Sequence, residues 1–457
     1  MTSPYQLTSY PLGSKREFWT MSWPLMLAMI SSSLMIFIDR LFLAKYHSII
    51  LNAAASGGIA YYIFLVLPMS IASISEVLTG RLHGEKRHKE IGSSVWQMVW
   101  FSIFLTPVFL LIIFTVPPIL FKGTGIEMQE TAYFKILMYF APFQCITIAL
   151  SGFFIGIGKV KVITISAILG NLVNISLDYI LIFGWKSIPA FGIAGAAFAT
   201  GFSQLIQTIF LLIMILKPTE RSTYQTENCG FRRHFFIEGL KIGTPFGLGH
   251  MVEIMAHFLF FRIVMSVNQT QMTIVAMVQS FYILCSFIND AGSKAASAIV
   301  SNLLGAEVKS PIKKVLKSAF SLQCFYFLFF TSFFFLFPDF LINLFLSSKE
   351  SSLLADDHMR HTFILALFFM TIFFLFDGFG WILIGFLTAA GDTKFIFWTS
   401  LFIHWIAYVA PTVVFIGIAK KGADTAWAIV AGMSVLNALI YLYRYQTGKW
   451  LKEYKKI

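Results

Sequence analysis

Three polar residues share one stripe of an otherwise apolar stretch. Asn171, Asn174 and Asp178 are spaced i, i+3 and i+7, which places them on one face of a helix. An amide or a carboxylate is costly in hydrocarbon, so this face should point into a helical bundle or a water-filled cavity. The stripe is therefore either a functional site or a polar cluster that holds helices together.

Two isolated carboxylates lie deep in apolar sequence in the second half of the chain. Glu253 follows Pro245 by eight residues, and Asp377 precedes Gly385 by eight. Such groups on neighbouring helices can share a proton or hold a monovalent cation. On the helix of Glu253, Arg262 lies nine residues further on, about 13 Å away and too far for a direct pair. We therefore expect a proton or cation site here, with a structural polar pair as the alternative.

Two other acids stand beside a cation. Asp39 ends an apolar run and is followed directly by Arg40, which could hold it charged and limit its use as a proton carrier. For Asp39, an ion pair with Arg40 thus competes with a functional role. Asp290 and Lys294 are spaced i and i+4, which predicts a buried ion pair between them.

His250, Glu253 and His257 are also spaced i, i+3 and i+7, on one face of a predicted helix. Two imidazoles and a carboxylate could ligate a transition metal, but no fourth ligand is evident. We therefore expect no metal site. The histidines are instead predicted to line a cleft and to tune Glu253.

The composition identifies the kind of chain that must position these groups. Its 457 residues are 57% hydrophobic and 12% charged, with a mean hydropathy of +0.77. Soluble domains are about 25% charged, so this chain should be a polytopic membrane protein. Its net charge of +12 lies in the segments between apolar runs, which indicates membrane orientation and not nucleic-acid binding. The four cysteines have neither disulfide nor zinc spacing.

A membrane-spanning helix needs about 20 apolar residues, and the chain holds about twelve such runs. They lie near 19–44, 52–79, 93–116, 132–156, 162–184, 193–216, 239–266, 272–299, 315–337, 361–389, 395–417 and 425–443. If residues 1–18 lie inside, the inside segments carry roughly 23 Lys and Arg, against 7 outside. This asymmetry predicts a multi-pass protein of the cell (inner or plasma) membrane with both termini in the cytoplasm.

The chain repeats itself. Pro24 matches Pro245 at an offset of 221 residues, and Gly158 matches Gly391 at an offset of 233. The 12 additional residues fit a longer outer loop at 338–360. Both halves begin on the same side, which is typical of a parallel repeat about an axis along the membrane normal.

The repeat predicts an all-α fold of two pseudo-symmetric six-helix bundles around a central cleft. Residues 1–228 form the expected amino-terminal lobe and residues 229–457 the carboxy-terminal lobe. The polar stretch 217–238 is predicted to be a long cytoplasmic linker. Such a two-fold bundle is the architecture of an alternating-access transporter.

A long stretch of the first half resembles a known family. The pattern N-x-x-N-x-x-x-D-Y-x-L-I-F-G at 171–184, followed by G-I-A-G-A-A-x-A-T at 192–200, is similar to the fifth and sixth helices of the multidrug and toxic compound extrusion (MATE) transporters. The resemblance extends over nearly the whole chain. It implies that Asp39, Asn174, Asp178 and Thr200 form a cation or proton site in the amino-terminal lobe.

The second half resembles the NorM-like branch of this family. That resemblance implies that Glu253 and Asp377 form the cation site of the carboxy-terminal lobe. The chain departs from the family at Asn289, where a Pro is usual, although the first-half counterpart Pro68 is kept. A kink in the eighth span is therefore in doubt.

Some large apolar residues could line an adaptable drug cavity. The candidates on the first, seventh and eighth spans are Met35, Met255, Met277 and Phe281. Phe373 lies one turn before Asp377 and could offer a face to a cation. Ordinary packing is the alternative for each of these side chains.

Four charged or imidazole side chains flank the inner end of the second span: Glu76, Arg81, His83 and His88. Their position beside a polar loop predicts solvated side chains. No function is expected from them.

The sequence thus predicts a secondary antiporter. No enzyme is expected, because the helices carry no Ser/His, His/Asp or metal cluster beyond the stripe at His250. It would export organic, often cationic or amphipathic compounds in exchange for sodium ions or protons, as a monomer in membrane lipid and without a cofactor. The choice between the two coupling ions stays open. The alternative is a flippase of lipid-linked precursors or polysaccharides from the same wider superfamily. Such a flippase would need a strongly basic cavity.

Overall fold

The computed structural model describes residues 6–267, 269–337, 357–454 and 456. The regular secondary structure of the described residues is helical, and no β-strand occurs among them. The helices of the first half are α1 (Lys15–Tyr46), α2 (Ser48–Ala72), α3 (Ser75–Gly84), α4 (His88–Phe104), α5 (Thr106–Thr115), α6 (Pro117–Leu120), α7 (Glu127–Gly156), α8 (Lys161–Phe183), α9 (Ile193–Ile215) and α10 (Pro218–Tyr224).

The second half begins in α11 and is built in the same way. Its helices are α11 (Arg233–Val267), α12 (Gln269–Gly305), α13 (Ile312–Leu336), α15 (Asp357–Ala390), α16 (Thr393–Phe402), the π-helices η2 (Ile403–Val409) and η3 (Thr412–Ile418), α17 (Ala423–Gln446) and the 3₁₀ turn η4 (Lys449–Lys452). Most of the outer loop predicted at 338–360 lies outside the described residues.

Twelve helical segments of the described chain are long and apolar enough to cross a membrane, as the sequence predicted. The seventh begins at Arg233, ahead of the predicted 239. Together with the short helix α10, this shortens the predicted linker 217–238. The remainder is held against α4, where Trp96 and Trp100 donate their indole N–H groups to the backbone oxygens of Thr226 (2.7 Å) and Cys229 (2.8 Å).

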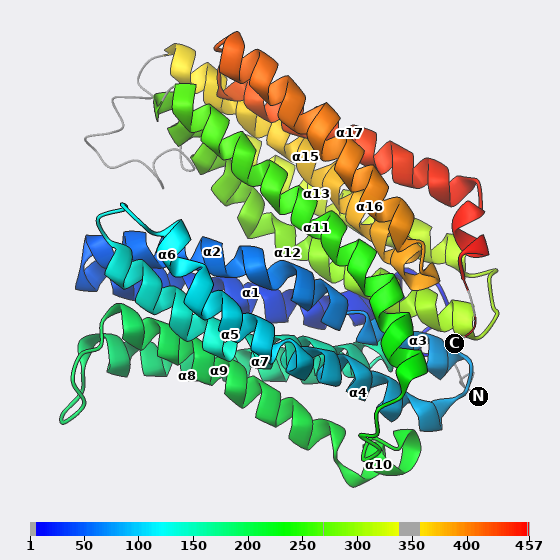
Figure 1. Cartoon of the computed structure of the whole chain (residues 1–457). Helices are drawn as coiled ribbons and strands as arrows, with labels where there is room; N and C mark the ends of the chain where they lie inside the picture. The colour runs from blue at the N-terminus through cyan, green and yellow to red at the C-terminus, as the bar shows by residue number, and fades with distance from the viewer. Residues whose placement is uncertain (1–5, 268, 338–356, 455, 457) are drawn as a thin grey trace.

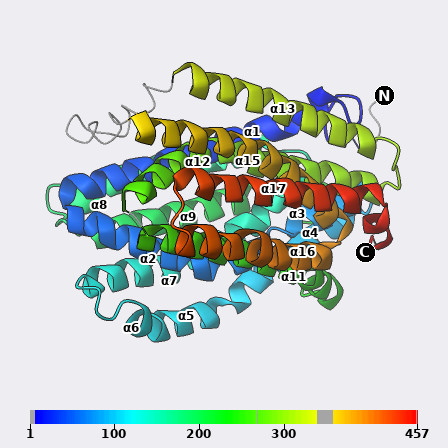
Figure 2. The ribbon, with the colours of Figure 1, turned by 90° about the horizontal axis from the view of Figure 1, so that it is seen from above.

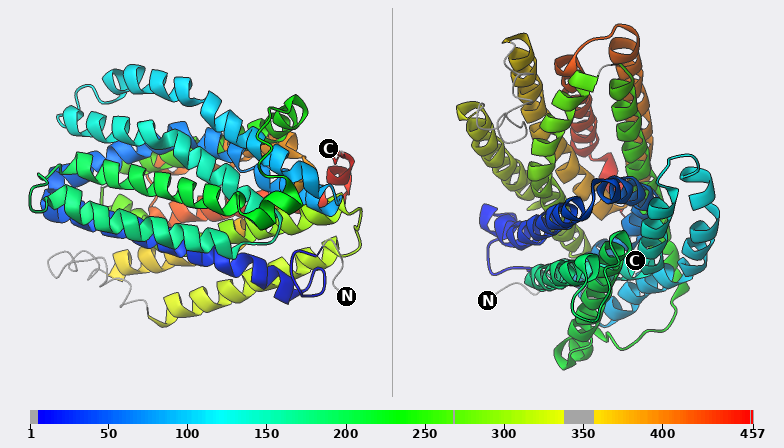
Figure 3. Two further views of the ribbon diagram at one scale, coloured as in Figure 1. Left: turned by 90° about the horizontal axis from the view of Figure 1, so that it is seen from below. Right: turned by 90° about the vertical axis from the view of Figure 1, so that its left-hand side faces the viewer.

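The helices form two groups that diverge toward one end of the molecule and meet at the other, beside α3, where both termini lie (Figure 1). An end-on view places the two groups on either side of the molecule (Figure 3). At one edge, α13 of the second group lies beside α1 (Figure 2). The division of the chain at 228/229 stays a prediction.

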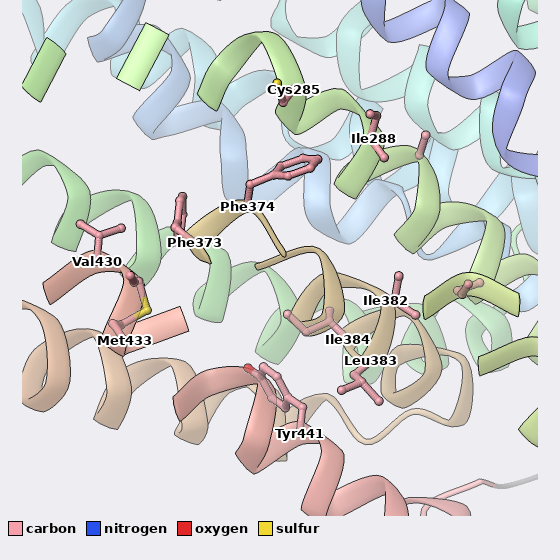
Figure 4. Packing of buried hydrophobic residues seen from close by; sticks show 14 of the residues in the cluster. Cys285, Ile288, Phe373, Phe374, Ile382, Leu383, Ile384, Val430, Met433 and Tyr441 are labelled. Atoms are coloured by element: carbon pink, nitrogen blue, oxygen red, sulfur yellow. The ribbon is translucent and has the colours of Figure 1, made fainter. Parts of the chain in front are cut away.

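Each group has its own apolar core. One core is drawn from the first half. The other is drawn mainly from the second half, together with the inner part of α1 and with Ile155 and Val160. In the second core, Phe373 and Phe374 of α15 pack with side chains of α12 and α17 (Figure 4). The inner half of α1 therefore packs into the second core, whereas Leu43 near its other end packs into the first.

The second and eighth spans differ in shape. The second span contains Pro68 and is interrupted at Ser73 and Ile74, between α2 and α3. Proline removes a helical hydrogen bond, so it favours such a break. The eighth span, with Asn289 in place of the proline, continues as one helix, α12. The kink that the sequence left in doubt does not interrupt this helix.

Candidate functional site

The polar stripe of α8 points into the first bundle. Asn174 and Asp178 are both fully buried, at 0% exposure. Asn171 donates its side-chain N–H to Ser31 Oγ of α1 at 2.7 Å. One orientation of the Asn174 side-chain amide satisfies both of its ends. Its N–H then donates to Asp178 Oδ2 (3.0 Å), and its oxygen accepts from the Thr200 backbone N–H of α9 (3.2 Å). The stripe thus joins α8 to its two neighbours.

Asp39 of α1 completes this group of side chains, which we call the amino-terminal site: Asp39, Asn174, Asp178 and Thr200. The Asp39 and Asp178 carboxyl groups interact electrostatically. Each has a buried Oδ1 atom with no hydrogen-bond partner among the described residues. Two unpartnered carboxylate oxygens in one interior site are the kind of ligands that a proton or a small cation can satisfy.

A cavity of about 650 Å³, which we call the outer cavity, adjoins the amino-terminal site. Asp39, Arg40 and Thr200 line it from the first half, and His257 lines it from α11. The predicted cleft residue Met35 also lines this cavity. Its volume lies within the range of about 300–1,000 Å³ that is usual for small-molecule sites.

In the second bundle, Asp377 is held by neutral donors. Tyr282 Oη donates to Asp377 Oδ2 at 2.7 Å, and Asn289 Nδ2 donates to the same oxygen at 2.8 Å. Asn289 in turn accepts from Gln323 Nε2 of α13 at 3.0 Å. The residue that replaces the usual proline therefore supplies a hydrogen bond to the candidate site carboxylate.

Glu253 lies within electrostatic reach of Asp377 and also of Asp290. The predicted ion pair of Asp290 with Lys294 is wrong in detail. The two side chains interact electrostatically, but no ion pair within 4.0 Å joins them in the described part of the chain. The second bundle thus brings together three carboxylates, of which sequence reasoning had assigned two to the site.

The histidines extend this group. His250 Nδ1 is 3.3 Å from Ser70 Oγ of α2, and its ring meets that of Trp381 edge-on at 5.5 Å. The ring of His257 lies 5.1 Å from that of Tyr408 and 6.4 Å from that of His404. Sequence reasoning missed His404. The direction in which its side chain points depends on a π-helix, whose register differs from the usual 3.6 residues per turn. No metal-binding group of three such side chains occurs among the described residues.

Four predicted cleft residues lie elsewhere. Met277, Phe281 and Phe373 are buried in the core of the second bundle, at 5%, 2% and 3% exposure. Phe373 packs against the ring of Tyr282 at 4.5 Å, so its face is already covered. Met255 is 43% exposed and lines neither the outer cavity nor the inner chamber described next. The structure therefore assigns packing roles to the three buried side chains.

A second cavity of about 210 Å³ lies between the two halves, and we call it the inner chamber. Its charged lining residues are Glu76 of α3 and Asp290 and Lys294 of α12. Glu76 is only 8% exposed, so the predicted solvation of this residue is wrong. Tyr62 lines both the inner chamber and the outer cavity.

Beyond the chamber, α3 closes against the second half, at what we call the inner seal. Arg81 is 1% exposed, contrary to the predicted solvation, and its Nε donates to the backbone oxygen of Ala389 at 3.0 Å. The guanidinium also covers the ring of Tyr454 at 5.2 Å. His83 Nδ1 is 2.7 Å from Asn302 Nδ2 of α12. These contacts join the two halves at the end where the termini lie (Figure 1).

Comparison with solved structures shows the same fold over almost the whole chain. A MATE structure in the straight conformation covers 99% of this chain and 100% of its own, with a TM-score of 0.87 and 17% identity. A MOP superfamily transporter from Pyrococcus furiosus covers 99% of each chain, with a TM-score of 0.85 and 18% identity. The expected all-α transporter fold is therefore confirmed.

Sequence relatives agree with this fold. A probable multidrug resistance protein NorM from Pseudomonas syringae pv. tomato is 22% identical over 96% of this chain and 97% of its own. A protein of the same name from Acinetobacter baylyi is 22% identical over 52% of this chain and 54% of its own, so in several such matches the chain spans about half of the relative. The family model MatE matches residues 24–180 and 245–413.

The two matched segments of the family model fall on the two halves of the repeat, and they leave out the linker between them. Together they cover more than half of the chain. The family and the relatives are transporters and not enzymes. The protein therefore belongs to the MatE family, the multidrug and toxic compound extrusion (MATE) transporters.

Proposed function

We propose that the protein is a secondary active antiporter that exports organic, often cationic and amphipathic, compounds in exchange for sodium ions or protons. One observation carries this proposal. Asp39 and Asp178 come from different helices, interact in the interior of the first bundle, and keep buried oxygens without partners. A fixed structural cluster would satisfy those atoms, whereas an exchangeable ion can occupy and leave them.

The outer cavity is the proposed substrate site. It shares Asp39 and Thr200 with the amino-terminal site, so occupancy by substrate and by ion can influence each other. Its lining combines charge, amides and aromatic rings, as a site for amphipathic compounds requires. The names of the NorM relatives, which are described as multidrug resistance proteins, support this substrate class.

Transport would proceed by alternating access of two lobes, 1–228 and 229–457. With both termini in the cytoplasm, as the Lys and Arg asymmetry indicates, the inner seal closes the cytoplasmic side. An ion gradient can drive the cycle only if the ion binds one of the two states more tightly. We propose that this difference in ion affinity arises at the amino-terminal site and at the three carboxylates of the second bundle.

The flippase alternative has less support. A site for an anionic lipid-linked precursor would need an excess of cations. Arg40 in the outer cavity is accompanied by Asp39, and Lys294 in the inner chamber is accompanied by Glu76 and Asp290. Neither cavity is strongly basic, so no second function is proposed.

The proposed function can be tested by efflux of the cationic dye ethidium from proteoliposomes, with the sodium and proton gradients collapsed one at a time. We expect collapse of one gradient to stop concentrative efflux and to identify the coupling ion. Efflux that persists with both gradients collapsed would contradict secondary antiport.

The proposed orientation predicts the outcome of cysteine labelling. In a variant without the native cysteines, Ser187→Cys in the loop between α8 and α9 should react with a membrane-impermeant maleimide on intact cells. Glu227→Cys in the linker should react only after permeabilisation, because the two positions lie beyond opposite ends of α9. Equal labelling of both positions from outside would disprove the topology.

The three carboxylates of the second bundle are expected to be unequal. Asp377 already accepts two hydrogen bonds from neutral donors, whereas Glu253 has no hydrogen bond through its carboxyl group among the described residues. Glu253→Gln should therefore reduce ion-driven efflux at least as much as Asp377→Asn, and Asp377→Asn should lower thermal stability more. Efflux and melting temperature of the two variants test this order, which the reverse pattern would refute.

A further inference from the structure

The inner chamber has a charge pattern of which the proposed ion coupling uses only Asp290. Glu76 reaches it from the first half, and Asp290 and Lys294 reach it from the second. Lys294 interacts electrostatically with both carboxylates. When all three groups are ionised, two negative charges and one positive charge leave the chamber with one net negative charge. The ammonium group of Lys294 is thus a permanent positive charge between the carboxylate of Glu76 from the first half and that of Asp290 from the second.

The chamber also holds a buried hydroxyl group that needs a partner. Ser297 and Thr388 line it, and they are only 3% and 5% exposed. Ser297 lies within hydrogen-bonding reach of Glu76, whereas the hydroxyl oxygen of Thr388 has no hydrogen-bond partner among the described residues. Buried hydroxyls are usually satisfied, so water or a polar ligand should occupy the space that Thr388 faces.

The remaining walls suit an organic cation. Trp381, Tyr62 and Phe246 contribute aromatic rings, and Met29 and Met69 contribute flexible thioethers. Aromatic faces attract cations, and methionine adapts its shape to different ligands. A chamber with one net negative charge and such walls complements a compact, flat, singly charged organic cation.

We propose that the inner chamber is a second binding site, for singly charged organic cations, and that Lys294 sets this charge selectivity by neutralising one of the two carboxylates. The inference rests on the proposed export of organic cations and adds a substrate class and a location to it. Because Tyr62 lines both cavities, a cation bound in the chamber would lie next to the outer cavity.

The selectivity follows from the charge balance. With Lys294 replaced by a neutral residue, Glu76 and Asp290 would leave two net negative charges, and a doubly charged ligand would then be favoured. Interactions between charges a few ångströms apart inside a protein are strong enough to change relative affinity by about tenfold or more. Replacement by Arg should preserve the selectivity, since the resident charge is kept.

Two probes of nearly equal shape differ in this one property. 1-Methyl-4-phenylpyridinium carries one charge, and 1,1′-dimethyl-4,4′-bipyridinium carries two. Their affinities for the purified, full-length protein can be measured by isothermal titration calorimetry without any ion gradient. We expect the wild type to prefer the singly charged probe and Lys294→Gln to shift the ratio of affinities toward the doubly charged probe by about tenfold or more.

Three variants complete the test. Lys317→Gln makes the same change of charge on an exposed face of α13, and Lys294→Arg keeps the charge; both should retain the wild-type ratio. Glu76→Gln should weaken binding of the singly charged probe. Its effect on the ratio separates the chamber from the outer cavity, which Glu76 does not line. Thermal melting confirms that each variant is folded.

An unchanged ratio in a folded Lys294→Gln protein would overturn the inference. The same holds if Lys317→Gln shifts the ratio equally, because the effect would then come from net charge. These outcomes are distinct from failure of the proposed function. Normal gradient-driven efflux of ethidium with an unchanged ratio rejects only the chamber site, whereas absent efflux rejects the antiport.

Discussion

Replacing Asp178 by Asn is expected to abolish gradient-driven efflux while the protein still inserts and folds. Asn has almost the same shape as Asp, so it can keep the contact with Asn174 that joins the stripe on α8. It cannot release a proton or balance the charge of a bound sodium ion. Since Asp39 and Asp178 interact, the change also removes the mutual repulsion that an ion bound between them would relieve. We expect loss of concentrative efflux to the background of empty liposomes.

The measurement is ethidium efflux per molecule of reconstituted protein, with gradient-free binding of the dye as a second readout. Glu227→Gln is the matched control, because it makes the same carboxylate-to-amide change in the exposed linker. If Asp178→Asn lowers the amount of protein but leaves efflux per molecule normal, the stripe is a structural cluster. Retained dye binding without efflux is the result that antiport requires.

The amino-terminal site could be predicted because it depends mainly on one regular helix. The spacing of Asn171, Asn174 and Asp178 fixes their common face as long as α8 is unbroken, which it is from Lys161 to Phe183. The contribution of Asp39 came from the family resemblance and not from spacing. Asp39 and Asp178 interact electrostatically in the structure, and their role as an ion site stays a prediction.

Contacts between the two halves could not be predicted in this way. Glu76 and Arg81 stand beside polar residues in the sequence, so they were interpreted as solvated, yet the fold buries both. Their partners on α12 and α15 are hundreds of residues away, as the contact between Arg81 and Ala389 shows. A pattern within one helix carries no information about which distant helix will cover it.

Large apolar side chains gave the least reliable predictions. Met35 lines the outer cavity, but Met277 and Phe281 are core residues of the second bundle. In a chain that is 57% hydrophobic, the type of residue does not distinguish lipid, core and cavity. The distinction depends on the rotation of each helix, which isolated polar residues reveal and continuous apolar runs do not.

At the inner seal, glycines let α3 and α12 approach each other closely. The seal is therefore unusually sensitive to one added carbon atom. A Cβ on Gly84 would collide with the backbone oxygen of Asn302, and a Cβ on Gly305 would collide with the backbone oxygen of Arg81. Both obstacles are main-chain atoms of the opposite half, so no side-chain rotation can remove them. Small residues allow such a close approach of helices, and the seal depends on it.

Gly305→Ala is therefore expected to separate α3 from α12 and to shift the protein toward a state that is open at the end bearing the termini. Overpacking of this kind costs about 1–3 kcal/mol, which changes the ratio of two conformations by a factor of roughly 5 to 150. Spin labels at Lys161 and Lys313, exposed positions on the inner ends of α8 and α13, would report the change as a longer distance in pulsed electron spectroscopy.

Gly292→Ala is the matched control on the same helix, because its Cβ would meet only Ile382 at an ordinary contact distance of 3.7 Å. It should leave the distance distribution unchanged. Gly84→Ala, which adds the carbon from the other side of the seal, should reproduce the effect of Gly305→Ala. A folded, monodisperse Gly305→Ala protein with the wild-type distribution would show that the closure does not depend on this contact. Opening in both seal variants, combined with loss of ethidium efflux, is the outcome expected if export requires the seal to close in every cycle.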